Sequence, residues 1–185
     1  MTASSAPRLP LRLHHSAYPS KDLEATRHFY EDLLGLPLVA TWCEKDFLFG
    51  AEREYCHVFF GIGDGGALAF FQFADAESER EFVPETPKTP FRHLALKTDR
   101  ETQDAMWQRL VEAGYREPRI FMLDHGYCRS IYAEDPNGML IEFTCDPDNV
   151  EAINADQRQK AHRELKRWLA GDRTSNNPYA HRAET

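Results

Sequence analysis

The chain has 185 residues, of which 42% are hydrophobic and 12% aromatic, and its formal net charge at pH 7 is -8. This length and composition predict one globular domain of about 150 residues with additional terminal segments. The acidic balance provides no basic stripe that could neutralise a phosphate backbone, so a nucleic-acid partner is not expected.

Neither a membrane span nor a disulfide framework is predicted. The longest apolar run, residues 67–71, is far too short to cross a bilayer, and the N-terminus lacks the apolar segment of a signal peptide. We therefore expect a soluble, cytoplasmic protein. The four cysteines lie far apart without a Cys-x-x-Cys pair and are expected to be free thiols.

The first half of the chain predicts one helix and four strands. Residues 1–10 are rich in Ser, Pro and Ala and are expected to be disordered. Gly35 stands where a left-handed residue commonly ends a helix, and the polar residues 44–54 are expected to form a loop. The other predicted elements are a helix at 23–34 and strands at 11–18, 38–43, 55–62 and 67–73.

The second half repeats this order. Residues 77–90 are acidic, contain three prolines and predict a linker. A strand at 91–98 follows, and then a helix that Asp99 caps and Gly114 ends. The matching elements recur with a period of about 78 residues, which indicates an internal duplication of a βαβββ unit.

The predicted domain organisation follows from this duplication. A helix with an apolar stripe of Ala161, Leu165, Trp168 and Leu169 ends the structured part, and we expect it to cover the core rather than to form a homodimer contact. The predicted segments are a disordered N-terminus (1–10), a domain (11–146) made of module one (11–76), a linker (77–90) and module two (91–146), a C-terminal helix (147–172) and a polar tail (173–185).

A hairpin near the end of module two contains a carboxylate in an apolar strand. Its turn runs from Asp135 to Gly138, and pairing of the strands brings Glu142 opposite Ile131 or Tyr132. An unpaired carboxylate in such a strand would be costly, so Glu142 needs a cation. The cation is either an arginine, such as Arg92 or Arg129, or a metal ion.

Equivalent positions in the two modules carry potential metal ligands. His15 and His93 fall at the same place on the first strand of each module, and Gln72 and Glu142 fall near the end of each last strand. His14 must face the other side of its strand. Two imidazoles and one carboxylate suit non-haem iron, and also manganese, zinc or nickel. Gln72 is a candidate fourth ligand or a hydrogen-bond partner.

At these residues the sequence resembles the vicinal oxygen chelate superfamily, which includes glyoxalase, fosfomycin resistance proteins, methylmalonyl-CoA epimerase and type I extradiol dioxygenases. The resemblance implies an α+β fold in which the two modules form one open, cup-shaped mixed β-sheet with a metal site inside. It covers residues 11 to about 145. The motifs that carry it are His15-Ser-Ala-Tyr-Pro-Ser-Lys-Asp22-Leu23, His93-Leu-Ala-Leu and Asp135-Pro-Asn-Gly-Met-Leu-Ile-Glu142.

The spacing of His125, Tyr132, Asp135, Gly138 and Glu142 is similar to the extradiol dioxygenase signature. By that resemblance His125 and Tyr132 are the active-site histidine and tyrosine. The metal site implied by the same resemblance consists of His15, His93 and Glu142.

The function expected from this resemblance is an iron(II) extradiol-type dioxygenase that acts on a catechol-like or other vicinal-oxygen small molecule with O2. The alternative is a divalent-metal isomerase, epimerase or lyase of the glyoxalase type, in which Gln72 completes the metal shell. A third hypothesis is a protein that sequesters a drug or another small molecule. Fe(II) is the favoured metal, and Mn, Ni, Co, Zn and Mg are the alternatives.

Overall fold

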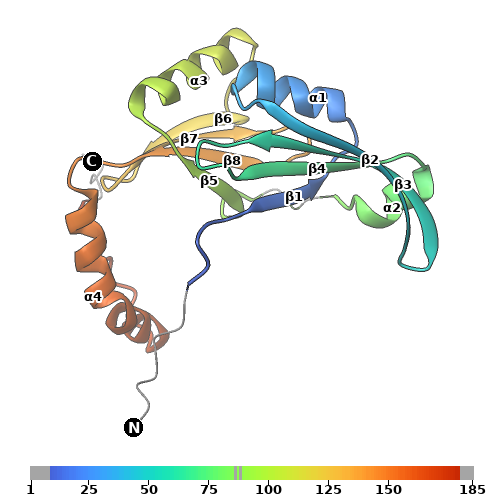
Figure 1. The fold of residues 1–185 in the computed structure, drawn as a ribbon. Coiled ribbons are helices and arrows are strands. Elements are labelled where there is room, and N and C mark those ends of the chain that lie inside the picture. Colours follow the sequence, from blue (N-terminus) through green and yellow to red (C-terminus); the bar gives the residue numbers. More distant parts are fainter. Residues whose placement is uncertain (1–8, 86, 88, 180–185) are drawn as a thin grey trace. The chain divides into compact units, whose positions relative to one another are not determined.

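Two βαβββ modules followed by a long helix make up the chain, as Figure 1 shows. The computed structural model describes residues 9–179 except residues 86 and 88. The predicted α+β class, the duplication and the C-terminal helix are confirmed. The expectations for residues 1–8 and 180–185 lie outside the described residues.

The chain divides into two compact units, which nearly coincide with the two modules. Unit 1 holds the residues up to 88 together with the turn 135–138, and unit 2 holds 89–134 and the residues from 139 onward. The sheet of unit 1 has the order β1-β4-β3-β2, in which only β1 and β4 are parallel. The elements of unit 1 are β1 (His15–Pro19), α1 (Leu23–Arg27), the π-helical turn η1 (His28–Leu33), β2 (Leu38–Leu48), β3 (Ala51–Gly61), β4 (Ala67–Phe73) and α2 (Ala76–Phe82).

The hairpin of β2 and β3 is longer than the sequence predicts. Residues 44–54 are expected to form a loop, but they belong almost entirely to the two strands. Their charges pair across the strands, since Lys45 contacts Glu52 at 2.7 Å and Glu54 at 2.9 Å. Opposite charges on facing strands stabilise a ladder that has little apolar content, so the loop prediction from polarity is wrong.

Helix α2 occupies part of the predicted linker. Asp75 precedes it, and its side chain accepts hydrogen bonds from the backbone N–H groups of Glu77 and Ser78. Such a cap satisfies donors that a helix start otherwise leaves without a partner. The linker prediction for this part of 77–90 is therefore wrong, because capping outweighs the acidic composition.

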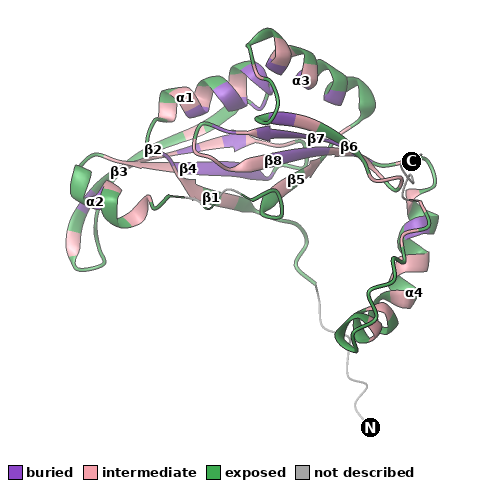
Figure 2. Ribbon diagram, turned by 180° about the vertical axis from the view of Figure 1, so that it is seen from behind, coloured by how far each residue is buried: buried purple, intermediate pink, exposed green. Residues whose placement is uncertain are grey.

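One face of the unit 1 sheet packs against the helical segment α1–η1. Val58, Phe60, Leu68 and Phe70 point to this face and are buried, as Figure 2 shows for the strands. Tyr30 lies against two of these rings, with centroids 5.4 Å from Phe60 and 4.8 Å from Phe70. This packing makes the α1 side of the sheet the hydrophobic core of unit 1.

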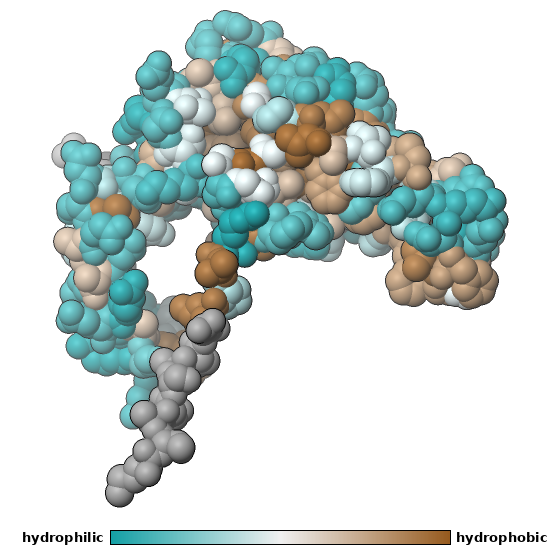
Figure 3. Space-filling view, in the orientation of Figure 1, coloured by the Kyte–Doolittle hydropathy of each residue, from teal (hydrophilic) through white to brown (hydrophobic). Residues whose placement is uncertain are grey.

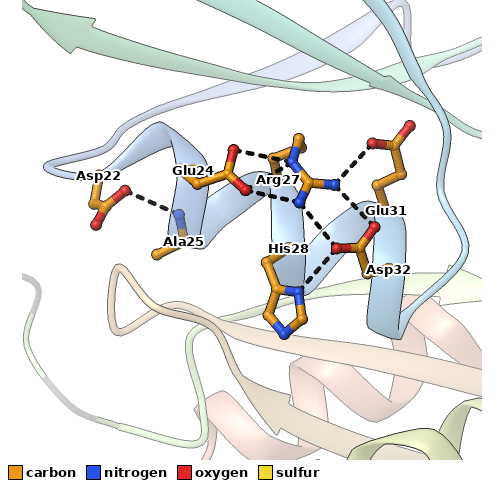
Figure 4. A network of polar contacts seen from close by, with 7 residues as sticks. All are labelled: Asp22, Glu24, Ala25, Arg27, His28, Glu31 and Asp32. Atoms are coloured by element: carbon orange, nitrogen blue, oxygen red, sulfur yellow. Dashed lines mark hydrogen bonds and ion pairs between the residues drawn. The ribbon is translucent and has the colours of Figure 1, made fainter.

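The outer side of α1–η1 carries a polar network (Figure 4). Arg27 contacts Glu24 at 2.7 Å, Glu31 at 3.2 Å and Asp32 at 2.8 Å. The hydrogen bond from Arg27 lowers the pKa of the Asp32 carboxyl to about 2. Asp22 begins the helix by accepting from the backbone N–H of Ala25 at 2.9 Å. These contacts hold the charged side of the helix in water and so leave its apolar side to the sheet.

Unit 2 repeats the arrangement of unit 1. Its sheet has the order β5-β8-β7-β6, with β5 parallel to β8. Ile131, Ile141 and Phe143 are buried on one face, and the buried Met106 and Leu110 come from α3. The elements of unit 2 are β5 (His93–Lys97), α3 (Arg100–Glu112), β6 (Ile120–Asp124), β7 (Arg129–Glu134), β8 (Leu140–Cys145) and α4 (Val150–Leu169).

The apolar stripe of α4 does not cover a core. Leu165, Trp168 and Leu169 are 56%, 54% and 75% exposed, and the buried residue of this helix is Ile153 near its start. The expectation that the stripe would cover the core is therefore wrong. Among the described residues, no helix has the length and apolarity needed to cross a membrane.

A buried hydrogen bond in unit 1 provides a stability test. The Tyr30 hydroxyl donates to Asp135 Oδ2 at 3.0 Å, and both residues are almost completely buried. Tyr30→Phe removes the donor but keeps the ring, so we expect the free energy of unfolding in urea to fall by about 1.5–3 kcal/mol. Tyr55→Phe is the control, because its hydroxyl donates to Asp46 at an exposed site. Equal losses in the two variants would contradict this assignment.

Candidate functional site

A histidine and a glutamate meet on the sheet of unit 2. His93 begins β5 and pairs with Leu140, while Glu142 lies two residues further along β8, so both side chains project from the same face. Their nearest atoms, His93 Nε2 and Glu142 Oε2, are 3.0 Å apart. Glu142 is buried, whereas the side chain of His93 is 31% exposed. The carboxylate that interrupts this apolar strand is therefore partnered by an imidazole.

The backbone determines which nitrogen of His93 carries a hydrogen. His93 Nδ1 lies 2.8 Å from the carbonyl oxygen of Pro90, which can only accept, so Nδ1 must be the donor. A neutral His93 then presents the lone pair of Nε2 to the Glu142 carboxylate. Two acceptors at 3.0 Å require a positive ion between or beside them, which is either a proton or a metal ion. A backbone carbonyl on the second ring nitrogen is also the usual arrangement of metal-binding histidines.

Tyr132 lies across from Glu142 on the neighbouring strand β7, as one of the two predicted registers requires. The tyrosine is 5% exposed and its ring packs edge-on to His93, with centroids 5.6 Å apart. Burial, followed by the hydrogen bond with Glu142, raises the pKa of the Tyr132 hydroxyl. The phenol is therefore a hydrogen-bond donor throughout the neutral pH range.

His125 reaches the same tyrosine from the loop between β6 and β7. Its Nε2 is 3.2 Å from the Tyr132 hydroxyl. The loop is held at both backbone groups of His125, since the N–H donates to Cys128 O at 2.9 Å and the carbonyl accepts from Asn177 Nδ2 at 3.3 Å. Residues His125, Tyr132, Glu142 and His93 thus form a continuous chain of polar contacts in unit 2.

His15 belongs to unit 1. It begins β1 and pairs with Ala67 of β4, which matches the pairing of His93 with Leu140 in unit 2. His57 projects from the same face of the sheet as His15. Its ring stacks on Phe71 with centroids 3.6 Å apart, and its Nε2 is buried without a partner among the described residues. Burial lowers the pKa of His57.

The motifs of the sequence do not indicate that His57 lies on the His15 face. The signal that could have identified it is the alternation of side chains along β3 and its pairing with β4.

The expected equivalence of Gln72 and Glu142 is wrong. Counting along the paired strands, Ala69 occupies the position in unit 1 that Glu142 occupies in unit 2. Gln72 lies three residues further and therefore projects from the opposite face, toward α1. Its Oε1 accepts a hydrogen bond from the backbone N–H of Leu23 at 3.0 Å. Gln72 supports the start of α1.

Arg129, one of the two arginines considered as a partner for Glu142, is paired with other residues. Arg129 contacts Asp104 at 2.7 Å and the Gln103 side-chain oxygen. The ion pair of Glu142 is formed with His93. Within the described part of unit 2, no third His, Cys, Asp or Glu side chain joins this pair in a metal-binding group.

Similar proteins support the family that the motifs suggest. The chain is 29% identical over 132 residues to the uncharacterized protein YwbC of Bacillus subtilis (strain 168), an alignment that covers 71% of this chain and 95% of that protein. A glyoxalase/dioxygenase from Nostoc punctiforme has a similar crystal structure, with a TM-score of 0.51 and 26% identity over 78% of this chain and 100% of that one.

A more distant structure shares the fold. It is a mutant of the fosfomycin resistance protein FosX from Listeria monocytogenes in complex with Mn(II) and 1S,2S-dihydroxypropylphosphonic acid. Its TM-score is 0.52 and its identity is 20%, over 73% of this chain and 92% of that one. The model of the Glyoxalase/Bleomycin resistance protein/Dioxygenase superfamily matches residues 12–143, which is most of the chain. The protein is therefore a member of this superfamily, also known as the vicinal oxygen chelate superfamily.

Proposed function

We propose that this protein is a metal-dependent enzyme, namely a non-haem iron(II) dioxygenase of the extradiol type that acts on a catechol-like or other vicinal-oxygen substrate. The observation that carries the proposal is the orientation of His93. Its Nδ1 is committed to a backbone carbonyl, and its Nε2 faces the Glu142 carboxylate at 3.0 Å. This pair of acceptors fits a divalent cation.

His93 and Glu142 would hold the metal ion, with His15 as the third protein ligand. His15 is proposed because it occupies in module one the position that His93 occupies in module two. A His, His, carboxylate set is the ligand set of non-haem iron(II) oxygenases, and it leaves coordination positions for other molecules. Bound Fe(II) would supply those positions for two substrate oxygens and O2, and the electrons that O2 activation requires.

The residues of unit 2 would direct protons and orient the substrate. Tyr132 keeps its proton at neutral pH and can donate a hydrogen bond to a substrate oxygen. His125, at 3.2 Å from that hydroxyl, can accept a proton from the substrate and return it at a later step. Burial of Glu142 and Tyr132 keeps water away from these groups and so strengthens each contact.

The position of Gln72 disfavours the rival isomerase, epimerase or lyase function. That hypothesis uses Gln72 to complete the metal shell, but Gln72 projects from the α1 face of its sheet and holds Leu23. Ala69, which matches Glu142 in register, cannot bind a metal. With three protein ligands rather than four, more coordination positions are open, as dioxygen chemistry requires.

Oxygen consumption tests the proposal. Protein prepared without oxygen and loaded with Fe(II) should consume O2 when catechol or a substituted catechol is added, and should form a ring-opened product. The same protein loaded with Ni(II) or Mg(II) should consume none, because these ions do not supply electrons to O2. Substrate turnover without O2 in the Mg(II) or Ni(II) form would instead establish the isomerase or lyase function.

A further inference from the structure

The β2–β3 hairpin brings together two cysteines that are 13 residues apart in the chain. Cys43 of β2 pairs directly with Cys56 of β3, and their Sγ atoms are 4.0 Å apart. Both are free thiols. They lie in unit 1 and take no part in the chemistry proposed above for His93 and Glu142.

The turn of the hairpin determines how closely the two cysteine backbones approach. Both central residues of the turn 49–50 have positive φ, 53° and 86°, which is typical of a two-residue turn closed by a hydrogen-bonded pair, here Leu48 and Ala51. The two types of pair alternate along an antiparallel ladder, and the register is uninterrupted between this turn and the cysteines. Cys43 and Cys56 therefore form a non-hydrogen-bonded pair, in which facing Cα atoms are only about 4.5 Å apart.

This backbone spacing is suitable for a disulfide. Disulfide-bonded cysteines usually have Cα atoms about 4.4–6.8 Å apart and Cβ atoms about 3.5–4.5 Å apart. Side chains of a non-hydrogen-bonded pair come closest among facing residues of a sheet. Rotation of the Cys43 and Cys56 side chains can therefore bring the Sγ atoms from 4.0 Å to bonding distance with little movement of the strands.

The two thiols differ in their access to solvent. Cys43 is exposed, whereas Cys56 is partly buried. Burial, followed by the hydrogen bond with Cys43, raises the pKa of the Cys56 thiol, so Cys56 stays protonated at neutral pH. An oxidant in solution therefore reaches Cys43 first, and Cys56 lies beside it to attack the product of that reaction.

The hairpin between the cysteines and the turn is exposed on the face that carries them. Its side chains there are held by the ion pairs of Lys45 with Glu52 and Glu54, and exposed ion pairs contribute little stability. Figure 3 shows hydrophobic residues gathered at the tip of this hairpin, on the surface of the protein. A covalent bond between Cys43 and Cys56 would restrain this part of the hairpin.

We propose that Cys43 and Cys56 form a reversible cross-strand disulfide when the protein meets a disulfide oxidant such as oxidised glutathione. The Cys43 thiolate attacks the S–S bond of the oxidant, forms a mixed disulfide and releases one glutathione. The Cys56 thiolate then attacks Cys43 Sγ and releases the second glutathione. Two protein thiols are oxidised, and their protons remain on the two glutathione thiols. The reaction goes beyond the proposed function, since it needs neither a metal ion nor a catechol.

Equilibration with glutathione tests the proposal. The metal-free full chain is incubated without O2 at graded ratios of oxidised to reduced glutathione, its free thiols are alkylated in denaturant, and its peptides are identified by mass spectrometry. Cys43 and Cys56 should lose their thiols together and appear as one linked pair of peptides, and excess reduced glutathione should restore both. Four alkylated cysteines at every ratio, or a mixed disulfide without the linked pair, would overturn the proposal.

Cys128 and Cys145 provide an internal control. Cys145 pairs with Arg129, the residue after Cys128, so the two thiols project from opposite faces of their sheet. No disulfide between them should form in the same samples. A linked pair of their peptides would show that the treatment unfolds the protein and that the pairing of Cys43 with Cys56 has no significance.

Two variants test the order of the steps. Cys56→Ser should accumulate the mixed disulfide of Cys43 with glutathione, because the second thiol is missing. Cys43→Ser should form the adduct at Cys56 about tenfold more slowly, since that thiol is partly buried. Cys128→Ser is the matched control and should form the Cys43–Cys56 disulfide as the wild type does. Equal rates in the first two variants would exclude Cys43 as the thiol that reacts first.

Hydrogen exchange tests the effect on the hairpin. Backbone amides of residues 44–54 should exchange about tenfold more slowly in the oxidised protein than in the reduced protein, because the disulfide suppresses separation of the strands. Residues 91–146 should exchange equally in both forms. Cys56→Ser treated in the same way should show no slowing. Equal exchange of residues 44–54 in oxidised and reduced wild type would contradict the restraint of the hairpin.

Discussion

Loss of metal binding is expected when any one of His15, His93 and Glu142 is replaced by alanine. Replacing a residue that only orients a ligand typically lowers metal affinity about 10- to 100-fold. Removing a ligand itself should therefore lower metal affinity about 100-fold or more. Glu142→Ala also leaves His93 Nε2 without the carboxylate that lies 3.0 Å away. Metal content should be measured by elemental analysis after anaerobic purification, with circular dichroism to confirm the fold.

The control for this experiment is His162→Ala, because His162 is exposed on α4 and should retain the wild-type metal content. Gln72→Ala should also retain metal, since Gln72 supports the start of α1. A variant of His15, His93 or Glu142 with full metal occupancy would remove that residue from the ligand set. For His15, such a result would also show that the positional match between the modules has no functional meaning.

Tyr132→Phe and His125→Ala should lower turnover by about 10²- to 10⁴-fold while metal content stays at the wild-type level. The first change deletes only the hydroxyl that His125 Nε2 contacts at 3.2 Å, so the ring packing against His93 remains. Burial and the hydrogen bond with Glu142 raise the pKa of Tyr132. Titration of this phenol should therefore not limit the rate between about pH 6 and pH 9, because that range lies below even the ordinary tyrosine pKa of about 10.

Tyr127→Phe is the matched control for the hydroxyl. Tyr127 stacks on His125 with ring centroids 5.6 Å apart and is 43% exposed, so losing its hydroxyl should leave turnover unchanged. Rate and metal content must come from the same preparation. Wild-type turnover in Tyr132→Phe and His125→Ala at wild-type occupancy would mean that the similarity to the extradiol signature is coincidental.

The sequence alone determined the repeated architecture and the pairing at the centre of unit 2. Recurring strand, helix and glycine patterns predict the βαβββ modules, because each pattern is local and periodic. The short turn 135–138 restricts the register of β7 and β8 to two choices. One of these places Tyr132 opposite Glu142, as the structure does. Each of these two strands contains enough residues for the alternation of apolar and polar side chains to specify which face each residue occupies.

The tertiary structure determined the features that depend on contacts between residues distant in sequence. Gln72 resembles Glu142 in its place near a strand end, but the pairing of β1 with β4 assigns that match to Ala69. An offset of three residues reverses the face of a side chain, and the sequence does not reveal register across a parallel crossover. A cavity beside Arg53 likewise requires α2 and the full β2–β3 hairpin. The sequence predicts a linker and a loop at these places because their residues are largely polar. Long-range pairing, rather than local propensity, placed these groups.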